Sequence, residues 1–216
     1  MNVKRRRALE SFSNAPAMLG AALRRFPRKM WLYKKSSDQQ CIHDTVLHLA
    51  DSEVIEYVSC RRLIAEPGSS TLEIDLVVWS QGLGYFYQDI KGAMDVIRIL
   101  RRVTYRLLKA LPEAAWENTA ELPIHGRLSL GEWLEIRENL YPEHIQRMER
   151  IYSGWLESTA AGIPATSVRK TPPIESFTAW NGYEPQGWRV EQLWKKESRS
   201  DRVPGKKHNS VKCQRD

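Results

Sequence analysis

The sequence has few cysteines and no long apolar run, and each of these absences excludes a class of protein. Its 216 residues include three cysteines, Cys41, Cys60 and Cys213, and no C-x-x-C pair. This usage argues against a disulfide-stapled scaffold and predicts a reducing compartment, the cytoplasm. Because no run of about 18 apolar residues is present, we expect no membrane span.

Several catalytic and nucleotide-binding motifs are also missing. The chain has no G-x-G-x-x-G, no P-loop, no G-x-S-x-G, no H-E-x-x-H and no EF-hand loop. A short apolar stretch at 15–23 follows a basic cluster, but polar residues separate the two, and Arg24 and Arg25 come directly after it. We interpret this stretch as part of a helix rather than as an export signal.

What is present is the composition of a globular protein with an uneven charge. Hydrophobic residues make up 42% and charged residues 27% of the chain, which excludes disorder throughout. The net charge of +7 divides into +9 for residues 1–35, −7 for 36–162 and +5 for 163–216. Basic ends attract nucleic acid or anionic surfaces, but they also serve as solubilising tails, and both interpretations stay open.

Apolar periodicity predicts four helices, and therefore an all-α fold. We place the helices at about 15–26, 38–66, 85–111 and 130–158. The connections 67–84 and 112–128 are long, which is typical of loops that shape a site or carry a topological crossover. No strand is predicted, and residues 72–78 are either a short helix or an extended piece.

Capping residues and a run of arginines characterise these helices further. Asn14, with Pro16 in the first turn, is predicted to begin the first helix. The second and fourth helices begin at capping-box patterns, formed by Ser37 with Gln40 and by Ser129 with Glu132.

Along the third helix we interpret an arginine run as a solvated surface rather than as a nucleic-acid patch. That run comprises Arg98, Arg101, Arg102 and Arg106.

Residues 163–216 read as a basic, mostly irregular extension without a core of its own. Prolines interrupt it, and its last part is almost wholly polar. It nevertheless contains an aromatic group, namely Trp180, Tyr183, Trp188 and Trp194. These side chains either pack back on the bundle or form a partner-binding segment.

Four short motifs, in order along the chain, carry a family resemblance. They are H-L-A-D-S-E at 48–53, D-x-x-x-W at 75–79 with Gly84-Tyr85, L-L-x-x-L-P-x-x-x-W at 107–116, and H-G-R-L-S-L at 125–130. Together they resemble the signature of the DinB-like superfamily, also called DinB/YfiT-like metalloenzymes, over about residues 9–160. The resemblance implies a four-helix bundle with a crossover topology, often dimeric, in a cytoplasmic bacterial protein.

The resemblance also implies a divalent metal held by three histidines, one at the position of His48 and two spaced H-x-x-x-H in the fourth helix. Some relatives are implied to be hydrolases or thiol-dependent transferases that act at this metal. Here His144 matches the second histidine of the pair, whereas Leu140 occupies the first position and cannot ligate. Pro142 lies between them, so we expect a distorted turn. Two histidines with waters would make a weak zinc or nickel site.

Three further residues are candidates for the same pocket. Asp51 either orients His48 as an acid–base pair or forms a structural polar pair with it. Glu53 is expected to be structural and to reach an arginine across the bundle. His125, in the loop before the fourth helix, is a candidate replacement for the lost ligand. His48 itself is alternatively a packed core histidine.

The sequence therefore predicts a DinB-like bundle at 1–162 and a basic, aromatic-containing, partly disordered tail at 163–216. The first function hypothesis is an atypical metal-dependent hydrolase or thiol transferase with an incomplete three-histidine site and a small-molecule ligand. The second is a non-enzymatic scaffold for homodimerisation or partner binding. The third and weakest is binding of nucleic acid or anionic surfaces through the basic ends.

Overall fold

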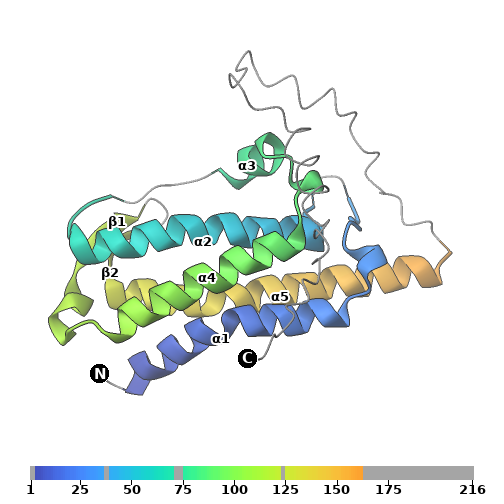
Figure 1. Cartoon of the computed structure of the whole chain (residues 1–216). Coiled ribbons are helices and arrows are strands. Elements are labelled where there is room, and N and C mark those ends of the chain that lie inside the picture. The colour runs from blue at the N-terminus through green and yellow to red at the C-terminus, as the bar shows by residue number, and fades with distance from the viewer. Residues whose placement is uncertain (1–2, 37–38, 71–74, 123–124, 163–216) are drawn as a thin grey trace, which may run out of the picture. The chain divides into compact units, whose positions relative to one another are not determined.

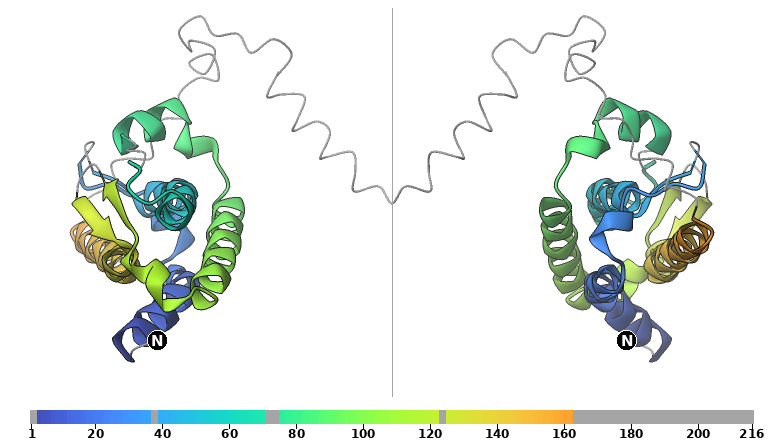
Figure 2. Two further views of the ribbon diagram at one scale, coloured as in Figure 1. Left: turned by 90° about the vertical axis from the view of Figure 1, so that its left-hand side faces the viewer. Right: turned by 90° about the vertical axis from the view of Figure 1, so that its right-hand side faces the viewer.

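The structure is a computed structural model, and it describes residues 3–36, 39–70, 75–122 and 125–162. Within these ranges, four long helices pack as a bundle (Figures 1 and 2). They are α1 (Val3–Arg25), α2 (Ile42–Ala65), α4 (Ile90–Lys109) and α5 (Leu130–Ala160). The smaller elements are α3 (Leu76–Gly82), the single turns η1 (Arg28–Met30), η2 (Tyr85–Tyr87) and η3 (Glu113–Glu117), and a hairpin of β1 (Thr119–Leu122) and β2 (Gly126–Ser129). The predicted all-α four-helix bundle with long loops is confirmed.

The connection between α2 and α4 is a crossover that runs back along the bundle. Tyr85, just before α4, bonds Asp51 in the first half of α2, whereas Asn118, after α4, bonds the carbonyl of Ile64 near the end of α2. The two helices therefore run in the same direction, as Figure 1 shows. Helix α1 packs against α4 and α5, and α2 packs against the same two helices. Residues from α2 and α5 thus meet inside the bundle.

The bundle interior consists of two apolar clusters with a polar layer between them. One cluster includes Leu19, Leu49 and Ile97, and the other includes Leu9, Leu63 and Leu108. Along α2 and α4, Glu53 and Arg101 lie between the residues of the two clusters, and both are buried. Because a buried charge must be paired, this layer fixes how the helices are aligned.

The predicted first helix begins too late. Instead of starting at Asn14, α1 starts at Val3 and contains Asn14 and Pro16 in its interior. The reason is that Ala8, Leu9 and Phe12 continue the buried stripe toward the N-terminus at helical spacing. Burial of this face outweighs the break that a proline and a potential cap would otherwise favour.

The predicted third helix is interrupted near its start. Gly84 adopts a left-handed conformation with φ 56°, and η2 follows it. Helix α4 then begins at Ile90, where the Asp89 carboxylate accepts from the Gly92 amide at 2.8 Å. Asp89 is thus an N-cap that the continuous apolar pattern concealed. Of the stretch 72–78, residues 71–74 lie outside the described ranges, and the remainder begins α3.

The start of α2 and the loop before α5 also differ from expectation. Helix α2 starts at Ile42, with Cys41 as its cap; residues 37 and 38, including the predicted cap Ser37, lie outside the described ranges. The loop before α5 contains the antiparallel β1–β2 pair, although no strand was predicted. These strands have four residues each, too few for a clear alternating pattern. The capping box of Ser129 and Glu132 at the start of α5 is confirmed.

Arg101 does not lie on the surface with the other arginines of α4, as the sequence predicted. It is 1% exposed and is among the most deeply buried side chains of the bundle. Arg98, Arg102 and Arg106 are exposed, as expected. The predicted extension 163–216, with its tryptophans, lies outside the described residues. Within the described ranges, no helix combines the length and hydropathy needed to cross a membrane.

Candidate functional site

Two histidines from different helices lie side by side inside the bundle. His48 is in the second turn of α2, and His144 is in the middle of α5. Both are buried, at 6% and 7% exposed, and their ring centroids are 5.5 Å apart with an angle of 60° between the rings. The structure therefore brings together the two histidines that the sequence assigned to one interior site. Their role as metal ligands stays a prediction.

Each of the two rings has a buried nitrogen without a partner. In the part of the chain that the structure describes, Nδ1 of His48 and Nδ1 of His144 make no hydrogen bond. Burial is the main cause that lowers the pKa of both from 6.5 to about 4. The positive charge of Arg147 contributes for both histidines, and His48 contributes for His144. Both imidazoles are therefore neutral at pH 7, which is the state that ligates metals.

The third ligand position holds an apolar side chain. Leu140 lies one turn before His144 and is partly buried against the first apolar cluster. Helix α5 continues through Pro142 without ending there. Among the described residues, no group of three or more His, Cys, Asp or Glu side chains is arranged to hold a metal. The two histidines therefore fit two ligand positions of a metal centre, and the described residues supply no third.

Asp51 is held by a tyrosine that sequence reasoning did not select. The Tyr85 hydroxyl donates to the Asp51 carboxylate at 2.5 Å and joins η2 to α2. Burial raises the pKa of Asp51, and the bond from Tyr85 acts in the opposite direction. Burial and the neighbouring carboxylate raise the pKa of Tyr85. The signal for Tyr85 was present, because it belongs to the Gly84-Tyr85 motif of the resemblance.

Glu53 is occupied by structural partners, in agreement with the sequence expectation. Arg101 Nε donates to Glu53 Oε1 at 2.6 Å, and the Tyr141 hydroxyl donates to the same oxygen at 3.0 Å. These residues come from α4, α5 and α2, so a single carboxylate joins three helices. Glu53 lies five residues after His48, and Tyr141 lies three residues before His144. The network therefore positions the two histidines relative to each other.

His125 is not brought to the histidine pair. It is exposed in the turn between β1 and β2. That hairpin bonds the chain just after α2, where the Gly68 amide donates to the Thr119 carbonyl at 2.7 Å. His48 lies near the opposite end of α2, about 25 Å from its C-terminus at a rise of about 1.5 Å per residue.

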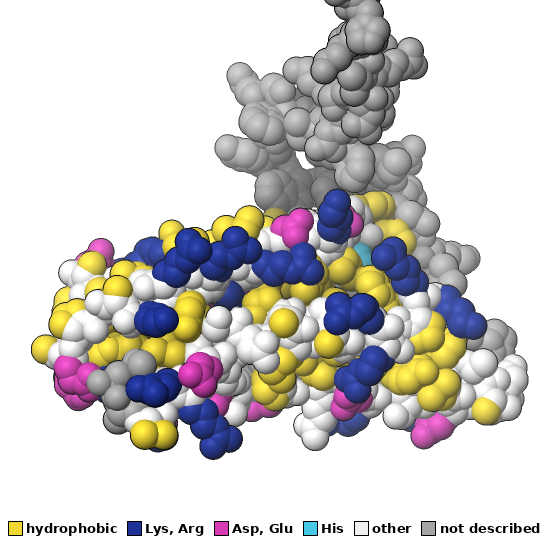
Figure 3. All heavy atoms as spheres, turned by 60° about the horizontal axis from the view of Figure 1, so that its bottom comes forward, with side chains coloured by type: hydrophobic (Ala, Val, Ile, Leu, Met, Phe, Trp, Pro, Cys, Tyr) yellow, Lys and Arg dark blue, Asp and Glu magenta, His cyan; other side chains and the backbone are white. Residues whose placement is uncertain are grey.

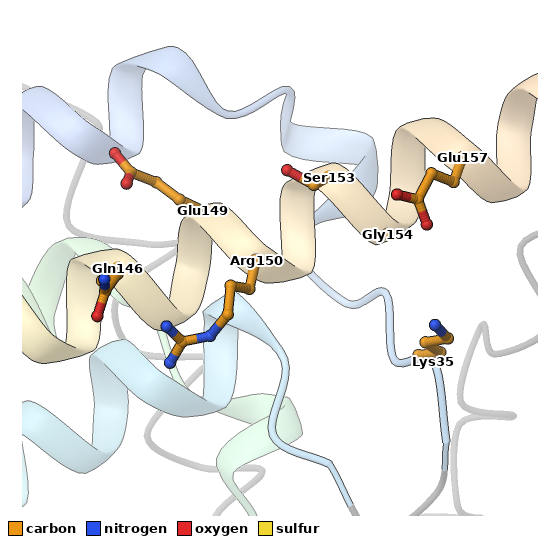
Figure 4. Close-up of a pocket in the computed structure, with 7 residues that line it drawn as sticks. All are labelled: Lys35, Gln146, Glu149, Arg150, Ser153, Gly154 and Glu157. Atoms are coloured by element: carbon orange, nitrogen blue, oxygen red, sulfur yellow. The ribbon is translucent and has the colours of Figure 1, made fainter.

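A hollow on the outer side of α5 is separate from the histidines. It has a volume of about 420 Å³, and six residues of α5 line it together with Lys35 (Figure 4). They are Gln146, Glu149, Arg150, Ser153, Gly154 and Glu157. At about 100° per residue, these positions face away from His144. Its two carboxylates are two turns apart, and Glu149 already accepts from Arg25 at 2.7 Å, so the hollow is not arranged as a metal site.

Comparison with solved structures supports the fold. The chain is similar to YfiT from Bacillus subtilis, a structure described as a probable metal-dependent hydrolase with an unusual four-helix bundle topology. The TM-score is 0.64 and the sequence identity is 17%, over 75% of this chain and 90% of YfiT. This likeness shows that the chain has the YfiT fold, which is the four-helix bundle that the resemblance of the sequence motifs implied. No protein-family model matches the chain, and no curated protein matches it.

Proposed function

We propose that this protein is an atypical DinB/YfiT-like metal-dependent enzyme whose centre is the pair His48 and His144. The observation that carries the proposal is the pair itself: two neutral imidazoles from two helices, with their rings 5.5 Å apart and an unpartnered buried nitrogen on each. A buried polar atom without a partner is unfavourable, by about 1–3 kcal/mol. A ligand that engages these nitrogens would remove that cost.

The chemistry of the two histidines suits zinc or nickel. Neutral imidazole is a common ligand of both ions, and two imidazoles leave coordination positions open. A divalent metal held there would supply Lewis acidity, as in hydrolases and in transferases that activate a thiol. The description of YfiT as a probable metal-dependent hydrolase supports the hydrolase alternative. We assign a small-molecule substrate to this site, because both histidines are buried inside the bundle.

The remaining residues hold the pair and its surroundings in place. The Glu53 network fixes α2 against α5, so His48 and His144 keep their separation before any ligand arrives. Asp51, held by Tyr85, has a raised pKa and lies one turn after His48, on the same helix face. A carboxyl group with a raised pKa is suited to transfer a proton. We assign Asp51 this role in the proposed reaction.

Metal titration tests the proposal. Untagged full-length protein would be stripped with a chelator and titrated with zinc or nickel by calorimetry. We expect weak binding by the wild type, lost in His48→Ala and in His144→Ala. His125→Ala is the matched control, because it removes an exposed histidine of the hairpin, and its binding should equal that of the wild type. Equal binding by the variant that lacks both His48 and His144 would refute the proposed centre.

The scaffold hypothesis is supported by a different observation. The outer faces of α2 and α4, which pack together, carry five exposed aliphatic side chains: Val54, Val58, Val96, Ile99 and Val103. Exposed apolar side chains that gather on one face mark an interaction surface. We propose homodimerisation as this second function. Sedimentation analysis should show a dimer for the wild type and a monomer for Ile99→Glu, whereas a monomeric wild type would refute it.

A further inference from the structure

Charge is segregated between the helix pairs of the bundle. Helices α1 and α4 each contain six Lys or Arg residues and one acidic residue. Helix α2 contains two basic and four acidic residues, and α5 contains three basic and six acidic residues. Because α1 and α4 pack against each other, the exposed basic residues on their adjoining flanks lie on one side of the bundle. Figure 3 looks onto this side, where dark blue Lys and Arg side chains gather.

The basic residues of α4 other than the buried Arg101 form a straight row. Lys91, Arg98, Arg102, Arg106 and Lys109 are all exposed. At about 100° per residue they lie within one sector of the helix, and the i, i+4 spacing of the arginines separates them by about 6 Å along the axis. The row extends over about 27 Å at a rise of about 1.5 Å per residue. Asp95 is the single acidic residue of α4 in this sector, and it pairs with Arg98 at 2.8 Å.

The row lies on the flank of α4 that faces α1. Met94, on the same flank, comes within 4.0 Å of the Cβ position of Gly20 in α1. Two arginines of α1, Arg6 and Arg24, are exposed near the two ends of that helix. The positions of α1 between them that point the same way are Glu10, Ser13, Ala17 and Gly20. Glu10 is the single acidic residue among them, and the other three are small and uncharged. The α1/α4 side, which we call the basic face, therefore offers positive charge along its length with little bulk in the way.

Much of this charge is not neutralised by the bundle. Within the described residues, Arg102 and Arg106 have no carboxylate partner, in contrast to Lys4, which pairs with Glu135, and Arg25, which pairs with Glu149. A row of like charges at i, i+4 spacing destabilises a helix slightly. A surface that only keeps the protein soluble does not require such a row, because a surface with alternating positive and negative charges would be equally soluble.

We infer that the basic face binds the phosphate backbone of a nucleic acid without reading its sequence. A nucleic acid is a regular line of negative charges, so a straight row of cations can neutralise several phosphates at once and release their counterions. Arginine suits this role because its planar guanidinium donates two hydrogen bonds to one phosphate. This function goes beyond the proposed metal centre, since no residue of the basic face belongs to the histidine site.

A nucleic acid fits the basic face better than an anionic membrane does. A helix that lies on lipid needs large apolar side chains beside its cations, so that they enter the acyl region. On α4 the exposed aliphatic residues Val96, Ile99 and Val103 lie on the flank away from α1, and none is aromatic. The basic face itself presents small residues and arginines, which is typical of backbone phosphate contact.

The test compares two double variants of the full-length chain that change the net charge equally. Arg102→Glu with Arg106→Glu reverses the centre of the basic face. Arg127→Glu with Arg150→Glu is the control, because it reverses two exposed arginines on β2 and α5. Both double variants keep the basic extension 163–216. Binding of a labelled random-sequence duplex DNA would be measured at several salt concentrations, with circular dichroism to confirm the fold.

We expect the wild type and the control to bind with a similar dependence on salt. The Arg102/Arg106 variant should bind about tenfold more weakly, and its slope of log K against log salt should be smaller by about 2, because two phosphate contacts are lost. An unchanged affinity and slope in that variant would overturn the inference and assign binding to the extension. Absence of DNA binding by the wild type would also overturn the inference. The same holds if the wild type binds vesicles of phosphatidylglycerol and phosphatidylcholine but not DNA.

Discussion

At the scale of single residues, Pro16 removes a hydrogen-bond donor from α1, and Arg101 of α4 supplies a replacement. A proline inside a helix has no N–H, so the carbonyl four residues earlier loses its helical donor. For Pro16 this carbonyl belongs to Phe12, and Arg101 Nη1 from α4 donates to it at 3.2 Å. The same guanidinium pairs with Glu53 and lies 3.9 Å from the centre of the Phe12 ring. Both partners of Arg101, the Phe12 carbonyl and the Glu53 carboxylate, lie inside the bundle, and the arginine is therefore buried with them.

We predict that Glu53→Ala destabilises the protein by about 3–5 kcal/mol, because it leaves the buried Arg101 without its counter-charge. The control is Glu66→Ala, which removes the partner of Arg62 in an exposed i, i+4 pair and should cost about 0–1 kcal/mol. Urea unfolding measures both free energies. A cost of Glu53→Ala no larger than that of Glu66→Ala would show that the polar layer is not what aligns the helices.

The lowered pKa values of the histidine pair predict a loss of stability in mild acid. Folded His48 and His144 have pKa values of about 4, whereas the unfolded chain has ordinary histidines near 6.5. Between these values the unfolded state binds more protons, so stability is full above about pH 6.5 and falls as the pH approaches 4. We expect a loss on the order of 3 kcal/mol for each histidine over this window.

Urea unfolding of metal-free protein at several pH values measures this loss. The double variant His48→Gln with His144→Gln serves as the reference. It lacks the two histidines but retains the carboxylates that also titrate in this range, so their contribution cancels in the comparison. The difference in unfolding free energy between wild type and variant should change with pH between about 4 and 6.5 and become constant above pH 6.5. Identical pH profiles for the two proteins would show that the histidines keep an ordinary pKa in the folded state.

Restoring the missing ligand should strengthen the metal centre. The wild type is expected to retain substoichiometric zinc or nickel on purification, because two imidazoles bind more weakly than three. Leu140→His places a third imidazole one turn from His144 and should increase metal content, and adding Pro142→Ala should increase it again by regularising the turn. Elemental analysis of untagged protein measures the content. A stoichiometric wild type, with metal lost in His48→Ala, would show that another residue already completes the site.

At the scale of the elements, the sequence predicts what is set locally and misses what is set by packing. The start of α5 was predicted because Ser129 and Glu132 cap each other within three residues. The start of α1 was missed because burial of Leu9 and Phe12 against distant helices overrides Asn14 and Pro16. The start of α4 at Ile90, rather than at the predicted Tyr85, was missed because the apolar pattern runs without a break from η2 into α4. The pairing of His48 with His144 came from motif resemblance, since nothing local joins residues 96 positions apart.

The capping box at α5 gives a prediction at this scale. Its serine hydroxyl accepts from the Glu132 amide at 3.3 Å, and the Glu132 carboxylate accepts from the Ser129 amide at 2.8 Å. We expect Ser129→Ala to destabilise the protein by about 1 kcal/mol. Ser153→Ala, on an exposed turn of the same helix, should change stability by less than about 0.5 kcal/mol. Thermal unfolding of both variants measures the difference, and equal midpoints would show that the cap is dispensable.

At the scale of the whole molecule, the two apolar clusters contain residues from Ala8 to Trp155. The YfiT-like part of the chain therefore has its own core. Its surface is mainly basic on α1 and α4 and mainly acidic on α2 and α5. The histidine pair lies inside this core, whereas the basic face lies outside on α1 and α4. Charge reversal on the basic face should therefore leave metal binding by the histidine pair unchanged, because the two sites share no residue.

This arrangement predicts that a chain ending at Gly162 folds on its own. It retains both apolar clusters and the Glu53 network, so it should unfold cooperatively in urea, as single domains with one packed core do. It should also bind zinc or nickel as the full-length protein does, since His48 and His144 remain. Loss of cooperative unfolding would show that the core needs residues beyond 162 and that the predicted domain boundary is wrong. A lower midpoint with cooperativity retained would show that Trp180, Trp188 and Trp194 pack on the bundle, because each buried large aromatic contributes about 1.5–3 kcal/mol.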